Sequence, residues 1–473
     1  MDDMNNQTQH SNERRKRKLT PFEEFSQSYL PIIIGGAALI LILVFLFGSV
    51  IQGFQYRTLE KQLTHDAQVA AKEERARLNT ELADLADGAA ELAKQYDYKG
   101  AIKLLNSFSG NRADFPALDR LIDAYEQEMA TLVHWTDFAS IPNLSFEMLI
   151  ADPQRAFKDA KYASSYKKNF ITTEEFKLVL EQLYQNGYIL ISMDHLYEYK
   201  LTDTGTAYYV EKELLLPAGK KPILLTQTQV NYNLYMVDSD GDMIADAGGA
   251  GFASKLIIDD NGNLANEYVT ADGTTEIGAY DLIPILESFI ATHQDFSYRG
   301  ARATIALTGY NGLFGYRTQA EAIKKLGEDV YNQEIENAKM IAKALQDTGY
   351  ELACYTYENK DYSKLTVDKI MADLSGWTAE VIPIVGQLDT FVFAKNADLA
   401  ASTNDYTSES YRVLDAAGFK VYLGYCKDGT PWLKDTDQYI RQGRIAVTAN
   451  NLMNQRSWFN DIIDPVAVLS VAR

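Results

Sequence analysis

The chain has 473 residues, a formal net charge of −20 and 46% hydrophobic residues. This length is typical of two or three domains, and the hydrophobic content is sufficient for a large core. Because nucleic-acid binding needs a basic face, the acidic balance excludes a nucleic-acid partner and favours a neutral or cationic ligand such as a glycan.

Only two cysteines occur, Cys354 and Cys426. Two are too few for a disulfide framework or for a zinc site built on cysteines. Both lie in strand-like runs, so we expect two small buried side chains, with a disulfide bridge between them as the alternative.

The N-terminal region predicts a membrane anchor. Residues 1–29 are polar and contain the basic run RRKRK, and the stretch Pro31–Ile51 that follows has no charged residue. About 20 such residues cross a bilayer core, and the positive-inside rule keeps the basic side in the cytoplasm. We therefore predict a cytoplasmic tail over 1–29, a transmembrane helix over 30–53 and an extracellular remainder of a single-pass cell-membrane protein.

A cleaved signal peptide is the alternative to this anchor. Its apolar region would have about 7–15 residues and would end at a small-residue cleavage site. The stretch here is longer, and FGSVIQGFQYRT after it holds no good site of that type. A retained anchor is therefore favoured.

Residues 54–131 are predicted to form an extracellular helical stalk. Leu78, Leu82, Leu85 and Leu92 follow helical spacing, which places them on one face of a helix. Its role is open between a spacer and a surface that binds another protein.

From residue 132 to residue 473 the pattern changes to strands that alternate with helices, such as Glu174–Asn186 and Glu334–Asp347. This alternation predicts an α/β fold with a largely parallel sheet, closed or nearly closed into a barrel, with the chemistry at the C-terminal ends of the strands. The strand-like runs are Tyr188–Met193, Pro222–Thr226, Ala303–Gly309, Glu351–Tyr357, Thr390–Phe393, Phe419–Tyr425 and Arg444–Thr448.

Within this region, several stretches occur in the order of a known family's landmarks. They are IPNLSFEMLI, DPQRAF, GFASKL, DLIPIL and DFSYRGARATIALTGYNGLFGYRT. The sequence from Trp135 to Arg473 resembles the polysaccharide deacetylases of the NodB-homology type, in particular membrane-anchored members from Gram-positive bacteria. The resemblance implies a distorted (β/α) barrel, the removal of acetyl groups from N-acetylated sugars, and a zinc or similar divalent ion held by one Asp and two His.

The family's metal and base positions carry other residues here. Where the resemblance places an Asp-Asp pair after a strand, this chain has Thr228 and Gln229. Where it places two histidines four residues apart, this chain has Tyr355 and Asn359. None of these side chains supplies the imidazole or carboxylate ligands of catalytic zinc.

Further motif positions are also changed. Ala394 begins the turn AKN, which replaces a Pro-Phe-Gly-type turn, and Thr448 stands near the family's late Asp-Gly motif. Asn143 and Glu147 take the places of two histidines near the first strand. The five histidines of the chain include no pair with metal-ligand spacing.

We therefore predict no bound cofactor and a catalytically inactive, deacetylase-like protein that binds a cell-surface glycan or assists its metabolism. One alternative is an active N-deacetylase with an unmapped site. The other is an assembly partner that acts through the stalk. The residues at the metal-ligand positions distinguish the inactive protein from the active deacetylase, because the deacetylase needs ligands that are absent from those positions.

An acidic loop offers a second, weaker candidate metal site. Asp238, Asp240, Asp242 and Asp246 alternate as in oxygen-rich calcium loops, but Met243 stands where a turn glycine is wanted. A solvated acidic turn is the favoured alternative.

Several aromatic rings, and two arginines within the landmark stretches, are candidate glycan contacts, although most aromatic residues in a barrel pack in its core or walls. Arg299 and Arg317 are candidates either for substrate contacts or for structural ion pairs. The candidates are Tyr298, Arg299, Arg317, Tyr357 and Trp377.

Overall fold

The computed structural model describes residues 20–158, 161–201, 203 and 207–470. The basic run at residues 14–18, on which the predicted orientation depends, lies outside the described residues. By its internal contacts the chain divides into two compact units, Met1–Ala83 and Asp84–Arg473. Each unit is described by itself.

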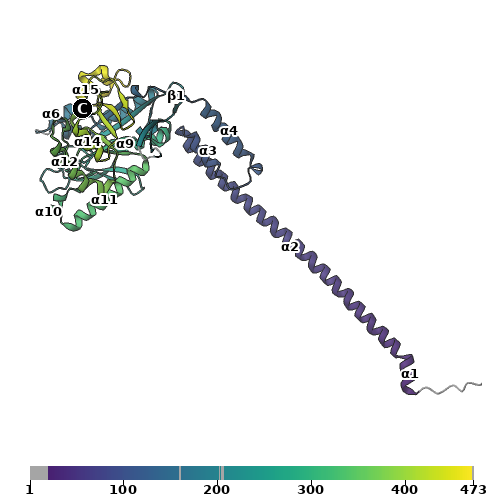
Figure 1. The fold of residues 1–473 in the computed structure, drawn as a ribbon. Coiled ribbons are helices and arrows are strands. Elements are labelled where there is room, and N and C mark those ends of the chain that lie inside the picture. The colour runs from purple at the N-terminus through teal and green to yellow at the C-terminus, as the bar shows by residue number, and fades with distance from the viewer. Residues whose placement is uncertain (1–19, 159–160, 202, 204–206, 471–473) are drawn as a thin grey trace, which may run out of the picture. The chain divides into compact units, whose positions relative to one another are not determined.

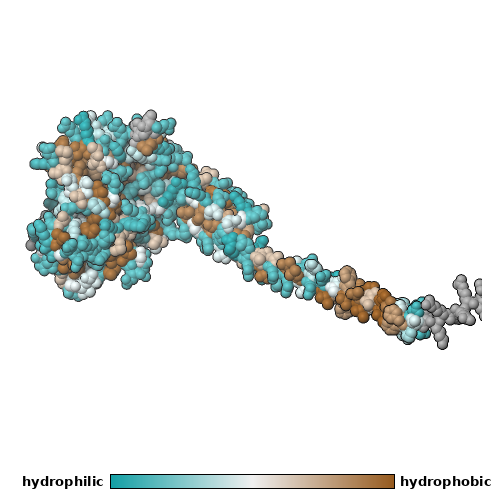
Figure 2. All heavy atoms as spheres, turned by 60° about the horizontal axis from the view of Figure 1, so that its bottom comes forward, coloured by the Kyte–Doolittle hydropathy of each residue, from teal (hydrophilic) through white to brown (hydrophobic). Residues whose placement is uncertain are grey.

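The first unit is helical. Helix α1 (Pro21–Ser28) begins with a capping box in which Thr20 and Glu23 satisfy each other's backbone N–H groups. Helix α2 (Leu30–Lys94) follows, and one stretch near its N-terminus has a mean hydropathy of 2.9 with none of its surface buried. Figure 2 shows apolar residues concentrated on this stretch. The stretch is long and apolar enough to cross a membrane, a measure that a signal sequence also meets.

The second unit opens with the end of α2 and the helices α3 (Tyr98–Leu105) and α4 (Pro116–Ala130) (Figure 1). Leu105, Leu118 and Ile122 are buried among them. The helical character expected of residues 54–131 is confirmed over these elements. By their contacts, residues 84–131 belong to the same compact unit as the barrel. The predicted domain boundary between residues 131 and 132 stays a prediction.

A closed parallel barrel forms the body of this unit. The main sheet has nine strands. Of these, β3 pairs only with β7 and β15 only with β16, so the remaining seven strands form the barrel. Strand β7 pairs with both β2 and β11, which closes the ring in the order β7-β11-β12-β13-β14-β16-β2. The barrel strands are β2 (Asn143–Phe146), β7 (Lys221–Thr228), β11 (Thr304–Leu307), β12 (Glu351–Cys354), β13 (Thr390–Val392), β14 (Val421–Tyr425) and β16 (Ile440–Ala446). The predicted α/β barrel class is confirmed.

Several strands lie outside the ring. β3 (Tyr188–Leu190), which the sequence pattern grouped with the other strands, extends the sheet next to β7, and β15 (Leu433–Asp435) runs antiparallel to β16. Antiparallel insertions make up the rest: β1 (Val133–Trp135) with β6 (Leu214–Leu216), β4 (Tyr197–Leu201) with β5 (Ala207–Glu211), and the sheet of β8 (Lys255–Ile258), β9 (Leu264–Val269) and β10 (Thr275–Gly278).

Alternate residues of the barrel strands supply two buried cores. Leu224, Ala306 and Leu423 pack in one cluster, while Leu225, Ile305 and Tyr422 pack in a larger cluster with the helices. Period-two alternation produces this division, because successive side chains of a strand point to opposite faces. Cys354 and Cys426 are buried and free, as expected.

Helices follow the barrel strands, and each of the longer ones buries one face. Helix α7 begins with a capping box between Thr172 and Glu175, and α11 ends at Gly349 in the left-handed conformation. The longer helices are α7 (Thr173–Gln185), α9 (Leu282–Thr292), α11 (Glu328–Thr348), α12 (Val367–Gly376) and α14 (Glu409–Ala416). The shorter ones are α5 (Pro153–Ala156), α6 (Ala163–Asn169), α8 (Leu234–Val237), α10 (Ile323–Leu326), α13 (Ile382–Val385), α15 (Ala449–Asn454) and α16 (Pro465–Leu469).

Candidate functional site

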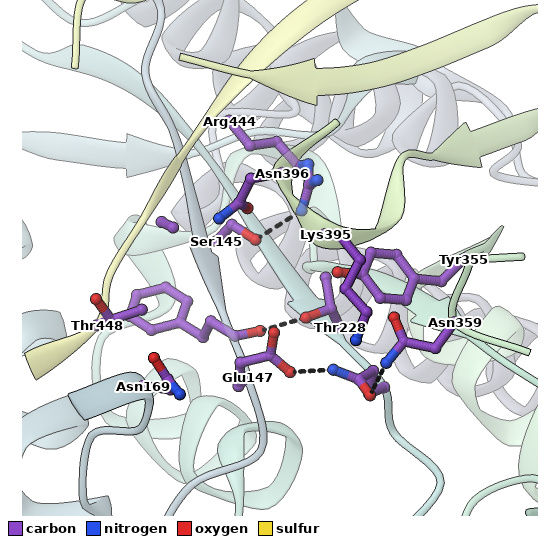
Figure 3. Close-up of a pocket in the computed structure, with 13 residues that line it drawn as sticks. Ser145, Glu147, Asn169, Thr228, Tyr355, Asn359, Lys395, Asn396, Arg444 and Thr448 are labelled. Carbon is purple, nitrogen blue, oxygen red and sulfur yellow. Dashed lines mark hydrogen bonds between the residues drawn. The ribbon is translucent and has the colours of Figure 1, made fainter. Parts of the chain in front are cut away.

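A cavity of about 250 Å³ opens where the barrel strands end, and we call it the barrel cavity (Figure 3). It lies at the C-terminal ends of the strands, where (β/α) barrels place their functional residues. The residues that line it are Ser145, Phe146, Glu147, Asn169, Thr228, Gln229, Tyr355, Asn359, Lys395, Asn396, Arg444, Ala446 and Thr448.

Strand ends bring together residues that are far apart in the sequence. Glu147 follows β2, Gln229 follows β7, Tyr355 follows β12, Lys395 lies beyond β13, and Arg444 is near the end of β16. The structure brings Thr228, Gln229, Tyr355, Asn359 and Thr448, which the sequence analysis singled out, to the lining of one cavity.

Two of the predicted motif positions have other roles. Ala394 does not line the cavity, because its side chain is buried in the barrel interior, and the next two residues of its turn line the cavity instead. Thr448 lines the cavity and also caps α15, since its hydroxyl accepts a hydrogen bond from the Asn451 backbone N–H at 3.1 Å.

A chain of side-chain hydrogen bonds crosses one wall of the barrel cavity. Asn359 Nδ2 donates to Gln229 Oε1 at 2.6 Å, and Gln229 Nε2 donates to Glu147 Oε2 at 2.6 Å (Figure 3). The Asn359 Oδ1 atom is buried and has no hydrogen-bond partner among the described residues. A buried acceptor of this kind is costly to leave unpaired, so it marks a place for a ligand donor or a water molecule.

The backbone around the barrel cavity is strained. Gln229, Asn359, Lys395 and Asn396 line it with φ angles of 60°, 54°, 59° and 55°, in the left-handed region that non-glycine residues rarely adopt. Such residues cost on the order of 1–3 kcal/mol each and cluster at functional sites, where the surrounding structure holds them in place. The cluster is independent of the hydrogen bonds and points to the same site.

Glu147 is the only carboxylate among the lining residues. Burial raises its pKa, and the hydrogen bond from Gln229 and the nearby Lys395 and Arg444 charges oppose that rise. A neighbouring hydroxyl, that of Thr228, donates to the Phe146 carbonyl at 3.3 Å. The hydrogen bond from Gln229 holds the Glu147 carboxyl group in place at the wall of the cavity.

Arg444 is a lining residue that the sequence reasoning missed as a functional candidate. Its side chain is 2% exposed, and its guanidinium donates to Ser145 Oγ at 2.9 Å and to the Gly424 and Phe393 carbonyl oxygens. Burial lowers its pKa, although nearby Tyr355 and Glu147 act against this. The available signal was an arginine at the start of the apolar run RIAV, because arginine is rarely fully buried unless its charge is paired.

The donor set does not fit the metal of the resembled family. A catalytic zinc site uses three protein ligands, usually imidazoles with or without a carboxylate. None of the residues lining the barrel cavity is a histidine or a cysteine, and the Gln229 carbonyl oxygen already accepts a hydrogen bond from Asn359. Two cations, Lys395 and Arg444, border the same space and would repel a divalent ion.

The described histidines lie elsewhere. Burial lowers the pKa of His195 to about 4, and its ring is packed edge-on against Tyr298. His293 caps the end of α9 and stacks on Phe289, and His134 lies in β1. These three histidines therefore lie outside the lining of the barrel cavity.

The five candidate glycan residues do not line the barrel cavity. Tyr298 and Arg299 precede β11, at the opposite end of the barrel, and Arg299 pairs with Asp97 at 3.4 Å. Arg317 is 3% exposed and donates to backbone carbonyl oxygens of residues 231, 232 and 311, and Trp377 is buried in the core. The Tyr357 hydroxyl donates to Glu380. A glycan role for these residues stays a prediction.

The acidic loop is compact. Asp238, Asp240 and Asp246 place one carboxylate oxygen each within 4.8 Å of the others, while Asp242 is not part of that group. Their oxygens also accept backbone hydrogen bonds, for example from Gly241 to Asp238 and from Gly248 to Asp246. Calcium at this loop stays a prediction.

No protein-family model and no curated protein matches the chain. Among solved structures the chain is similar to the Streptococcus pyogenes deacetylase PplD in complex with acetate, with 12% identity and a TM-score of 0.32. That match covers 72% of this chain and 100% of the other. A likeness this weak carries no argument about activity.

Proposed function

We propose that this protein is a membrane-anchored, extracellular glycan-binding protein, built on a deacetylase-like barrel that has lost its catalysis, with an accessory role in cell-surface polysaccharide metabolism. The observation that carries the proposal is the hydrogen-bonded chain Asn359–Gln229–Glu147. Gln229 and Asn359 occupy places that the resemblance assigns to metal ligands, and there they bond to each other.

The chemistry of the lining favours a sugar. Amide and hydroxyl groups act as both donors and acceptors, as sugar hydroxyls do, and a few such groups fix a ligand's orientation. A volume of about 250 Å³ lies below the range of about 300–1,000 Å³ for drug-sized ligands and is suited to a single sugar unit. The amides are Asn169, Gln229, Asn359 and Asn396, and the hydroxyls are Ser145, Thr228, Tyr355 and Thr448.

Loss of catalysis follows from the donor set. Metal-assisted amide hydrolysis needs an ion that lowers the pKa of its bound water and polarises the carbonyl. With one carboxylate and two cations around the cavity, these residues hold no such ion, so a bound N-acetyl group meets no activated water.

Anchoring is supported by the apolar stretch of α2, and the extracellular side by the basic run RRKRK that precedes it. A glycan-binding domain on that side meets surface polysaccharides directly.

Calorimetric titration of the full-length protein in detergent with chitotetraose tests the glycan function. We expect saturable binding that a chelator leaves unchanged. Gln229→Ala removes the centre of the hydrogen-bonded chain and should weaken binding by about tenfold, the effect of losing one to two hydrogen bonds. Gln438→Ala is the matched control, because Gln438 is exposed and precedes β16 at the other end of the barrel. Failure to bind any N-acetylated oligosaccharide would refute the proposal.

Glu147 favours a second candidate function, an active hydrolase that does without metal. A buried carboxyl group with a raised pKa in a cavity is a candidate general acid or base. Released acetate that disappears in Glu147→Gln while chitotetraose binding persists would establish this alternative in place of the first.

A further inference from the structure

The barrel cavity carries an excess of positive charge in a chain of net charge −20. Lys395 and Arg444 face a single carboxyl group, Glu147. Two cationic side chains and one carboxyl group therefore border the same space.

Neither cation is neutralised by an ion pair. Within the residues that the structure describes, the Arg444 guanidinium donates only to uncharged acceptors, namely one hydroxyl and two carbonyl oxygens. Among the described residues no carboxylate lies within 4.0 Å of the charged nitrogens of Arg444 or Lys395, although eighteen such pairs occur elsewhere. A buried guanidinium whose hydrogen-bond acceptors are all uncharged is costly, so an anion bound beside it would be favourable.

A second cavity of about 410 Å³ extends the site, and we call it the side cavity. It shares Lys395 and Asn396 with the barrel cavity and adds Lys364 and Lys427. Its two carboxylates are already paired, Asp361 with Lys364 at 2.6 Å and Asp398 with Arg441 at 2.9 Å. Lys427 has no ion pair within the described part of the chain, so the side cavity also has surplus positive charge.

The position of Lys395 joins the two cavities. It lies in the turn after β13 in a left-handed conformation, and Figure 3 shows its side chain among the residues that line the barrel cavity. A residue held in a strained turn presents its ammonium group from a fixed backbone position.

We propose that the ligand of the barrel cavity is an anionic glycan, whose carboxylate or phosphate group pairs with Lys395 and Arg444 while its neighbouring sugar unit lies in the side cavity beside Lys427. This inference rests on the glycan-binding function proposed above and adds the substrate class. The net charge of the chain favours a neutral or cationic ligand. The inference differs because the local charge of a cavity, and not the net charge of the protein, decides which ligand group it accepts.

Matched ligand pairs test the charge. Full-length protein in detergent is titrated with hyaluronan tetrasaccharide against chitotetraose for the carboxylate, and with N-acetylglucosamine 6-phosphate against N-acetylglucosamine for the phosphate. In at least one pair the anionic member should bind about tenfold more tightly at low salt, the size of one charge-assisted hydrogen bond. That advantage should shrink as salt is raised, because ions screen the partly exposed lysine.

Variants assign the effect to the site. Lys395→Gln should weaken binding of the anionic ligand much more than binding of the neutral ligand, and so reduce the anionic advantage, and Lys395→Glu should reverse the preference. Lys339→Gln is the control, since Lys339 lies on α11 paired with Glu336, outside both cavities. Lys395 is exposed, so equal melting temperatures are expected and confirm folding.

The outcomes separate this inference from the proposed function. Equal affinities within both pairs, or no effect of Lys395→Gln, would overturn the anionic assignment and leave glycan binding standing. Absence of binding to all four sugars would overturn both. Equally tight, Lys395-dependent binding of a single-stranded oligonucleotide would show general anion attraction and would also overturn the assignment.

Discussion

Gln229 shows how a residue can hold the geometry of a site without its chemistry. It stands directly after β7 with a φ of 60°, where the amide bridges Asn359 and Glu147. The strand-end position was predictable from the sequence, because an apolar run ends there. The hydrogen-bonded bridge was not predictable, because its side chains come from the ends of three strands. Only the closed barrel brings those strand ends next to one another.

Arg299 and Tyr298 illustrate the opposite case. Both were candidate glycan contacts, but they come before β11 and so lie at the N-terminal end of the barrel. Chain order alone contained this signal, since functional residues of a barrel follow their strands. Asn169 could not be foreseen, because it reaches the cavity from α6 through tertiary packing.

Glu351 provides a pH test at the same scale. Burial and the nearby Asp194 carboxylate raise its pKa to about 7, above the usual 4.5. A raised folded-state pKa contributes stability that is complete below about pH 4.5 and is lost as the pH rises through about 7. We expect Glu351→Gln to remove this loss and to stabilise the protein at pH 8 by about 1–3 kcal/mol.

Melting temperatures of the native protein and of Glu351→Gln between pH 4 and pH 8 check this prediction. Burial lowers the pKa of His195 to about 4, so both proteins lose stability on the acid side as this histidine becomes protonated. The difference between their melting temperatures therefore reports on Glu351 alone. Glu336→Gln is the control, as Glu336 is exposed on α11. Parallel curves for all three proteins would contradict the prediction.

The elements of the barrel were largely readable from the sequence. Each of the seven strand-like runs overlaps a strand, because buried parallel strands tend to give apolar runs. The sheet of β8, β9 and β10 was missed, since its short antiparallel strands are insertions between barrel strands and do not show the long apolar runs of the barrel. β3 was grouped with the rest because an apolar run does not reveal whether its strand closes the ring or extends it.

Helix starts give a quantitative test at the scale of an element. Thr172 caps α7 through a hydrogen bond from the Glu175 N–H at 3.1 Å, whereas Thr366 begins α12 without a side-chain cap. Thr172→Val keeps the buried volume and removes the hydroxyl, so it should cost about 1–2 kcal/mol of unfolding free energy. Thr366→Val should cost almost nothing. Urea denaturation of both variants checks the prediction, and equal losses would contradict it.

At the scale of the whole molecule, residues 84–131 raise the question of where the folding unit begins. The Arg299 N–H donates to the Gln95 carbonyl at 2.9 Å, and Gln294 donates to Glu91. The sequence predicts that 132–473 folds as one cooperative unit. We expect it to melt in a single transition, at a lower temperature than 84–473, because these contacts are removed. Two separate transitions within 132–473 would contradict the predicted boundary.

Membrane topology is tested by labelling. The native cysteines are both buried, so single cysteines introduced elsewhere report on their own positions. In intact cells an impermeant thiol reagent should label a cysteine placed after residue 60 and should not label one placed before residue 25. The reverse pattern would refute the extracellular location.

We propose above that the barrel binds an N-acetylated glycan without cleaving it. One proton NMR time course of chitotetraose with the full-length protein and added zinc reports on both halves of that claim. We predict broadened sugar signals, which show binding, and no free acetate above the rate without protein. A growing acetate signal that a chelator suppresses would contradict the account.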